Sequence, residues 1–197
     1  MKMKKNIFAV SALALALGSS AAYAGDTDLG LITFDGAVTD TTCKITTNNG
    51  VEANNITISL PVVKKADVEA ATIATRGVGA KEFELKLTGC PDTYDSAKAT
   101  FTSQQFAELS NGTLKADPTV AGAAQNVSLA LFNNTSGDQS QIKIGDMNAT
   151  QVADITTGEG MLAFMVSYVP SADWGLGTND IVAGKVNTNT TFTMSYE

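Results

Sequence analysis

The sequence predicts an all-β protein, a single antiparallel β-sandwich with immunoglobulin-like connectivity. Short segments in which apolar and polar residues alternate recur along the chain, and clusters of Gly, Asn, Asp and Pro separate them. Helical spacing occurs in one short segment, Lys64–Ala71. About 173 residues follow the N-terminal leader described next, enough for one core and one domain. No linker divides them, so we expect one sandwich.

Residues 1–24 have the features of a signal peptide. Three lysines lie within residues 2–5, residues 7–17 form an apolar run, and residues 22–24 are Ala-Tyr-Ala, with small residues where signal peptidase cleaves. The apolar run is shorter than the roughly 20 residues of a transmembrane helix. We therefore expect an exported chain that begins near Gly25 and has no membrane span, in preference to an N-terminal membrane anchor.

Charge and residue types exclude several functions. Removing the leader's three lysines from the 13 basic residues leaves 10, against 20 acidic residues, so nucleic acid and anionic membranes are poor partners. The chain has no histidine, the usual catalytic base and zinc ligand, and no G-x-S-x-G, P-loop or C-x-x-C motif. The Asp and Glu residues are scattered singly, which is typical of a solvated surface. We expect no enzyme, no metal site and no cofactor.

Two cysteines, Cys43 and Cys90, in an exported chain favour one structural disulfide. Closing a loop of this span contributes on the order of 4 kcal/mol in the chain-entropy model. A reactive thiol is the alternative, but the chain has no histidine to activate one.

The first expected strand lies almost at the start of the mature chain, in the stretch Leu29–Cys43. Ile32, Phe34 and Val38 fall on one parity of a period-two pattern, with Gly36 between them, and polar or small residues fall on the other parity. Terminal segments are poorly ordered unless something holds them. A well-formed strand in this place therefore needs a partner.

The later strands are expected where the same alternation recurs. At residues 54–60 three apolar residues alternate with polar ones before Pro61, and at residues 82–88 Phe83 and two leucines share one face. In chain order, strands are expected at residues 42–47, 54–60, 82–88, 98–102, 126–132, 141–144 and 161–168, with a weak strand among loops at 103–123 and a turn at 170–178 that holds Trp174.

The chain closes on a further alternating stretch, residues 191–197. Phe192, Met194 and Tyr196 share one side, and polar residues occupy the other. An exported sandwich with alternating strands at both ends of its sequence can pair them within the domain or offer them to neighbouring chains by strand addition.

The ordered set of motifs is more specific than any one of them. Phe34-x-Gly36-x-Val38 is followed by a cysteine nine residues after the phenylalanine, and the second cysteine closes an F-x-L-x-L strand. An Asn-Val-Ser-Leu-Ala-Leu segment begins at residue 126, and the 161–168 strand follows.

At the C-terminal end, Gly184 is fourteenth from the last residue and Tyr196 is next to last. Together these motifs resemble the pilins of the chaperone–usher pathway, in particular the major subunits of type 1-like fimbriae, over essentially the whole mature chain. In that family the domain is an incomplete immunoglobulin-like sandwich that lacks its last strand. The resemblance implies a hydrophobic groove that a periplasmic chaperone fills first and the N-terminal extension of the next subunit fills afterwards.

The resemblance divides the chain into a signal peptide (1–24), a donor-strand extension (25–40) and a pilin sandwich domain (41–197). It implies that Ile32, Phe34 and Val38 enter groove pockets, and that Gly36 takes a shallow pocket where a side chain would clash. Asp40 departs from the pattern, because it continues the inward parity; either the buried part of the donor ends near Val38 or Asp40 sits at the groove mouth. The other implied site residues are Gly184, Phe192, Met194 and Tyr196 along the groove-edge strand, and the Cys43–Cys90 bridge.

The expected function is therefore that of a structural subunit of a bacterial surface fimbria that supports adhesion. The resemblance implies head-to-tail polymerisation with copies of itself and other fimbrial subunits, assisted by the periplasmic chaperone and an outer-membrane usher, during export through the periplasm to the cell surface. A minor or adaptor fimbrial subunit is one alternative. The other is an exported binding domain whose first strand completes its own sheet.

Overall fold

Ten strands and one short helix make up the fold of the described part of the chain. The structure is a computed structural model that describes residues 42–197 except 48–49, 51, 54, 149 and 178. The strands are β1 (Lys44–Thr47), β2 (Val78–Thr88), β3 (Ser96–Thr102), β4 (Ala107–Glu108), β5 (Thr113–Lys115), β6 (Val127–Asn133), β7 (Gln141–Ile142), β8 (Val152–Asp154), β9 (Glu159–Pro170) and β10 (Thr191–Tyr196), and the helix is α1 (Lys65–Ala70).

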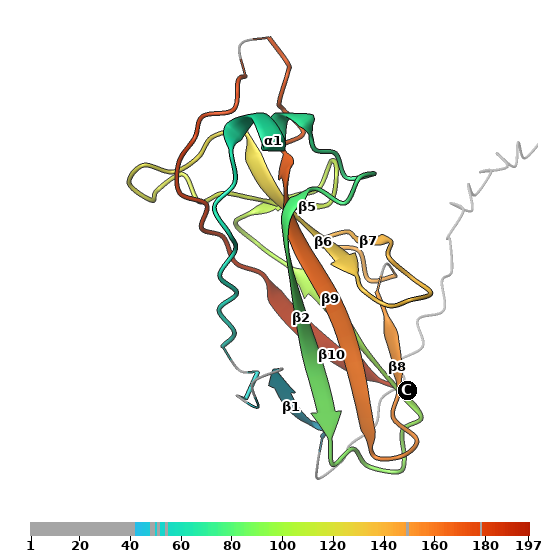
Figure 1. Ribbon diagram of the computed structural model, residues 1–197. Coiled ribbons are helices and arrows are strands. Elements are labelled where there is room, and N and C mark those ends of the chain that lie inside the picture. The colour runs from blue at the N-terminus through green and yellow to red at the C-terminus, as the bar shows by residue number, and fades with distance from the viewer. Residues whose placement is uncertain (1–41, 48–49, 51, 54, 149, 178) are drawn as a thin grey trace, which may run out of the picture. The chain divides into compact units, whose positions relative to one another are not determined.

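The strands form two antiparallel sheets. The larger sheet has the order β1-β2-β9-β6-β5-β4, with β7 also paired to β6, and the smaller has the order β10-β3-β8 (Figure 1). Leu85 and Phe164 of the larger sheet and Ala99 and Phe101 of the smaller sheet belong to one buried core. The ring of Phe101 meets that of Phe164 edge-on, with centroids 5.2 Å apart. The predicted all-β sandwich is confirmed.

The centre of the larger sheet is buried on both faces. Every residue of β6 is buried, as are six consecutive residues of β9. The inner face of β6 contributes Leu129 and Leu131 to the main core. A second buried cluster consists of Ala130, Phe132, Met165 and Val169, and Ile73 packs against it. The segment around α1 thus supplies the cover for the outer face of β6 and β9.

Most of the expected elements are present with shifted ends. The alternating stretches that begin at residues 82, 98, 126, 141, 161 and 191 form β2, β3, β6, β7, β9 and β10, and the expected helix is α1. β8 was not predicted, because only Ala153 of its three residues is buried and no alternation marks it. No described helix is long and apolar enough to cross a membrane.

The strand expected at residues 54–60 is wrong. Residues 56–63 belong to no strand, although Ile56, Ile58 and Leu60 are half-buried against the core and alternate with exposed Thr57 and Ser59. The alternation of apolar and polar residues in this segment therefore arises because one side of it contacts the core. A ladder also needs a neighbouring strand, and the sheets of the described chain supply none for this segment.

Candidate functional site

Each sheet of the described chain ends in two edge strands, β1 and β4 in the larger sheet and β8 and β10 in the smaller. β10 pairs only with β3, over the full register from Thr191 opposite Thr102 to Tyr196 opposite Ala97. β1 pairs with β2, and its Thr46 also forms an antiparallel bridge with Glu52 on the other side. The outer edge of β10 therefore presents backbone N–H and C=O groups that another strand can pair with, whereas on the outer edge of β1 the Ile45 carbonyl already accepts from the Ala53 N–H.

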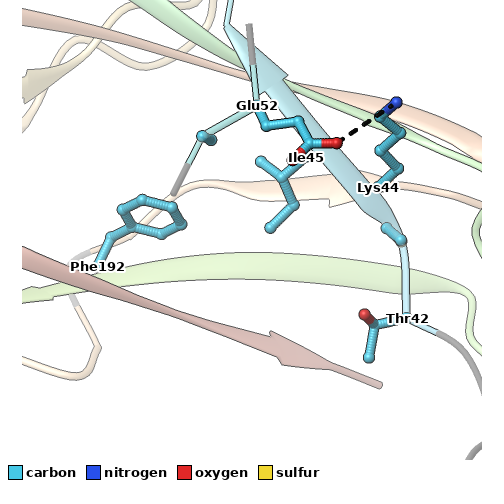
Figure 2. A pocket seen from close by; sticks show the side chains of 7 residues that line it. Thr42, Lys44, Ile45, Glu52 and Phe192 are labelled. Atoms are coloured by element: carbon cyan, nitrogen blue, oxygen red, sulfur yellow. Dashed lines mark ion pairs between the residues drawn. The ribbon is translucent and has the colours of Figure 1, made fainter. Parts of the chain in front are cut away.

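The smaller of two hollows lies between β1 and β10. It has a volume of about 290 Å³, and Figure 2 shows Ile45 of β1 and Phe192 of β10 on its walls. Lys44 and Glu52 form an exposed ion pair of 3.7 Å at this end, so their charges cancel. The full lining is Thr42, Cys43, Lys44, Ile45, Glu52, Ala53 and Phe192.

The second hollow is larger, about 470 Å³, and mainly apolar. Val127 of β6 and Tyr168 of β9 contribute to its lining, and burial raises the pKa of the Tyr168 hydroxyl, so it stays neutral. Its two charged lining residues are both lysines, Lys65 and Lys185. The full lining is Leu60, Pro61, Val62, Val63, Lys65, Val68, Ala124, Val127, Tyr168, Ile181, Val182, Ala183, Gly184, Lys185 and Val186.

The same two segments of the chain contribute to both hollows, with different residues in each. Residues 42–68 contribute to one side of both, and residues 181–192 contribute to the other. Between the hollows the C-terminal segment alternates, with half-buried Val186, Thr188, Thr190 and Phe192 separated by exposed residues. We call the row from Val186 to Phe192, with the hollow at each end, the groove.

The predicted groove-edge residues lie on one face of β10. Phe192, Met194 and Tyr196 are half-buried and pack against the core. The Phe192 ring lies 6.5 Å from that of Phe101, the Tyr196 ring lies 5.7 Å from that of Tyr94, and burial raises the pKa of the Tyr196 hydroxyl. These contacts hold β10 in place beside the groove, and recognition of this strand by a chaperone stays a prediction.

Gly184 lies before β10, at the edge of the larger hollow. A Cβ atom there would be 2.5 Å from the carbonyl oxygen of Gly122 and 2.6 Å from backbone atoms of Ala123 and Ala124. The backbone of Lys185 is bridged to Ala123 at the same place. A glycine is therefore required at this position for close backbone approach within the subunit, a reason that the sequence does not indicate.

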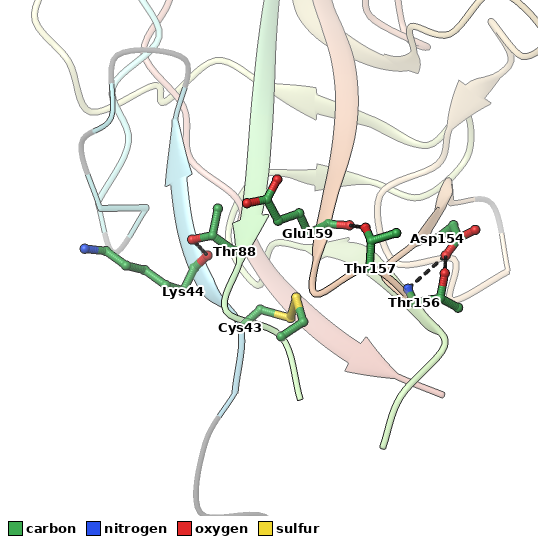
Figure 3. The surroundings of a disulfide bond; sticks show 8 residues. Cys43, Lys44, Thr88, Asp154, Thr156, Thr157 and Glu159 are labelled. Carbon is green, nitrogen blue, oxygen red and sulfur yellow. Dashed lines mark hydrogen bonds between the residues drawn. A yellow bond between two sulfur atoms is a disulfide. The ribbon is translucent and has the colours of Figure 1, made fainter. Parts of the chain in front are cut away.

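The disulfide between Cys43 and Cys90 is present, with Cα atoms 4.2 Å apart (Figure 3). It joins the start of β1 to the turn after β2, where the Cys90 N–H also donates to the carbonyl of Gly158. The Thr88 hydroxyl donates to the carbonyl of Lys44 at 3.5 Å. The bridge therefore fastens β1, one wall of the groove, to the larger sheet.

The predicted donor residues Ile32, Phe34, Gly36 and Val38 lie outside the described residues, as does Asp40. Their roles stay predictions. Among the described residues no group of three or more His, Cys, Asp or Glu side chains could hold a metal ion.

One acidic residue contradicts the expectation of a solvated surface. Glu108 is 4% exposed, and its Oε2 accepts hydrogen bonds from the Thr113 and Ser128 hydroxyls and the Ala172 N–H. Its Oε1 lies 3.2 Å from Lys115 Nζ. Burial works to raise the pKa of this carboxyl, but the bonds from Ala172, Thr113 and Lys115 outweigh it and lower the pKa. Sequence spacing gives no signal of this cluster, because its members come from four separate segments.

A groove beside an open strand edge is typical of β-sandwich domains that bind an extended polypeptide. Comparison with known proteins identifies the family to which this chain belongs. The chain belongs to the fimbrial protein family, whose model matches residues 32–197, and it is a structural subunit of a fimbria. The resemblance found in the sequence is confirmed.

The relatives match over nearly their full lengths. Long polar fimbria protein A of Salmonella typhimurium is 29% identical, over 99% of this chain and 98% of its own. The F17 fimbrial protein of Escherichia coli is 31% identical over 99% of this chain and 100% of its own. The major MR/P fimbria protein of Proteus mirabilis is 26% identical over 100% of both chains.

Proposed function

We propose that this fimbrial subunit polymerises by donor-strand exchange, in which the groove of one copy accepts residues 25–40 of the next. The observation that carries the proposal is a match of length. The groove runs from Val186 to Phe192, six residues apart, and the apolar row of the N-terminal extension runs from Ile32 to Val38, also six residues apart. At about 3.3 Å per residue both rows span about 20 Å.

The energetics favour the exchange. Burial of Phe34 and two branched aliphatic side chains contributes roughly 1.5–3 kcal/mol each. The open edge of β10 adds a strand's length of backbone hydrogen bonds. None of this free energy is available to a subunit whose groove is empty, so assembly is driven by the joint between subunits.

The geometry of the exchange explains a fibre. Each subunit uses one surface to give a strand and a different surface to accept one. Such a heterologous contact repeats from subunit to subunit. It builds an open filament whenever the rotation between neighbouring subunits does not return the chain of subunits to its start. The finished fibre carries the adhesive function of the organelle along the cell surface.

Assembly needs protection of the groove before the next subunit arrives. An open strand edge beside an exposed, mainly apolar hollow is an aggregation hazard. A periplasmic chaperone that pairs a strand of its own with β10 covers the groove, and an outer-membrane usher then passes subunits to the growing fibre. The role is structural and not enzymatic, consistent with the absence of histidine from the sequence.

The test of the proposal is Gly36→Arg, with Ala37→Arg as the matched control. The two positions are adjacent but of opposite parity, so only the first arginine points into the acceptor groove. We expect Gly36→Arg to abolish fibres in electron micrographs while the subunit still accumulates with its chaperone, and Ala37→Arg to assemble normally. Normal fibres from Gly36→Arg would disprove the donor role of this stretch.

A minor or adaptor subunit is the second candidate, because the same fold and exchange serve both kinds of subunit. The shaft role predicts that cells without this chain have no fibre. Fibres that persist, shortened or without a tip, would assign the chain to the adaptor role.

A further inference from the structure

The proposed donor segment is acidic, and this inference rests on the donor role just proposed. Residues 25–40 contain four aspartates and no lysine or arginine. Asp40 follows Val38 by two positions and so shares the inward parity of the apolar row. Asp28 has the same parity, but it lies four positions before Ile32, with Gly30 between them. Asp40 is therefore the charged residue closest to the buried row on that parity.

The two ends of the groove differ in charge. At the smaller hollow, Lys44 and Glu52 neutralise each other. At the larger hollow, Lys65 is paired with Glu69 at 3.3 Å, whereas exposed Lys185 has no ion pair with any described residue. An acidic residue at the end of a donor strand finds an unpaired cation only at the larger hollow.

This asymmetry selects the donor's direction. If the donor strand runs antiparallel to the C-terminal segment, Val38 lies at Val186 in the larger hollow, and Asp40 lies at the groove mouth beside Lys185. If the donor strand runs parallel to that segment, Val38 lies at Phe192 and Asp40 lies against half-buried Met194. The parallel arrangement places a carboxylate on an apolar surface, which costs free energy unless the charge is paired.

The middle of the groove supports the same direction independently. The Thr188 hydroxyl is buried and has no hydrogen-bond partner among the described residues. In the antiparallel register it lies beside Gly36, where no donor side chain covers it and the donor backbone comes close enough to bond it. In the parallel register the Phe34 ring covers it and leaves it unsatisfied, at a cost of about 1–3 kcal/mol.

We propose that Lys185 of the accepting subunit forms an ion pair with Asp40 of the incoming donor, and that this pair sets the direction and register of the donor strand. The occupant of the groove is a second copy of this chain. A charge at the rim of a binding groove acts mainly on the rate of association, and the effect is screened by salt.

The experiment measures binding of a fluorescent peptide of residues 25–40 to the freshly refolded mature chain by anisotropy, at low and at high salt. We expect Lys185→Glu to slow association by about two- to five-fold at low salt, the range of an exposed ion pair, and the difference to vanish at high salt. Lys185→Gln should give a smaller effect. Lys143→Glu is the control, because Lys143 is exposed and lines neither hollow.

Charge-swapped peptides complete the test. An Asp40→Lys peptide should restore the association rate on Lys185→Glu, and an Asp28→Lys peptide should not. Equal rates for Lys185→Glu and Lys143→Glu, or rescue by the Asp28→Lys peptide, would overturn the ion pair. Failure of the donor role has a different signature: the unmodified peptide does not bind, or a Gly36→Arg peptide binds as well.

Discussion

At Gly184 two backbone segments meet with no side chain between them. The contact fixes residues 182–185 against the 122–125 loop, where Gln125 and Val182 exchange two backbone hydrogen bonds. It therefore sets the position of the larger hollow's wall from which Lys185 projects. In the sequence, Gly184 is part of a motif that implies recognition by a chaperone. In the structure it also allows two backbone segments of the same subunit to pack closely, whether or not a partner is bound.

Gly184→Ala should destabilise the subunit by about 1–3 kcal/mol, since its methyl group would lie 2.5–2.6 Å from backbone atoms that cannot move independently. The denaturation midpoint of the purified mature chain measures the loss. The control is Gly137→Ala, where an added Cβ has nothing within 4 Å. Equal midpoints for the two variants would contradict the close approach.

Glu108 ties four segments together at the other side of the larger sheet. Because its pKa is lowered from the ordinary value of 4.5, its charged form stabilises the fold at pH values above about 4.5, and this contribution is lost as the pH falls through the lower folded-state pKa. Glu108→Gln keeps the volume and removes the charge. We expect a loss of about 1.5–3 kcal/mol at neutral pH, the range of hydrogen bonds to a charged group.

The pH profile makes that prediction specific. The stability gap between wild type and Glu108→Gln should narrow as urea midpoints are taken from about pH 6 to about pH 3, because the wild-type carboxyl becomes neutral too. Glu82→Gln, at an exposed position of β2, should show no such gap. A gap that stays constant over this range would contradict a charged Glu108.

At the scale of elements, β10 carries two functions along one strand. One edge is paired with β3, and the other is open towards the groove. Its inward side chains anchor it to the core, so the strand is held in place before any partner arrives. The anchoring residue nearest the C-terminus is Tyr196, packed on Tyr94.

Tyr196→Ala should weaken that anchor by roughly 1–3 kcal/mol, because a half-buried ring is lost. We expect a lower periplasmic level of the subunit and less co-purified chaperone, since a frayed β10 offers a poorer edge. Thr193→Ala, on the exposed side of the same strand, is the control. If Tyr196→Ala leaves both the level and the complex unchanged, the predicted role of this residue fails.

The elements that the sequence predicted are those in which one alternating face meets the core. Residues 82–88 and 191–197 are clear cases. The same signal failed at residues 54–60, because burial on one side does not require a neighbouring strand. β8 is too short to alternate, and the Glu108 cluster depends on contacts between distant segments. The alternation of apolar and polar residues indicates which residues are buried locally. Strand pairing depends in addition on whether another strand lies next to the segment in the folded domain.

At the scale of the whole molecule, a single chain combines two proposed roles, that of strand donor and that of strand acceptor. In the proposed exchange, the body, described from residue 42 onwards, accepts a strand, and residues 25–40 give one. Deletion of residues 25–35 should leave the thermal melt and elution volume of the subunit unchanged while removing its ability to donate. The truncated subunit should still accept a donor, so it should bind the peptide of residues 25–40.

The same deletion tests the remaining alternative, an exported domain completed by its own first strand. Such a domain would lose much of its stability when residues 25–35 are removed. A fall in the melting temperature of the truncated monomer, with no change in its oligomeric state, would favour self-completion over exchange between copies.

The open edge of β10 has a consequence for amide hydrogen exchange. In an antiparallel pair, alternate residues of a strand direct their N–H groups to the neighbour, and the others point away. In a free subunit, deuterium uptake along residues 191–196 should therefore alternate from one residue to the next, slow where the amide bonds β3 and fast where it faces the groove. If a donor strand pairs with this edge in the assembled fibre, the fast positions should become slow, and the alternation of exchange rates along this strand should disappear.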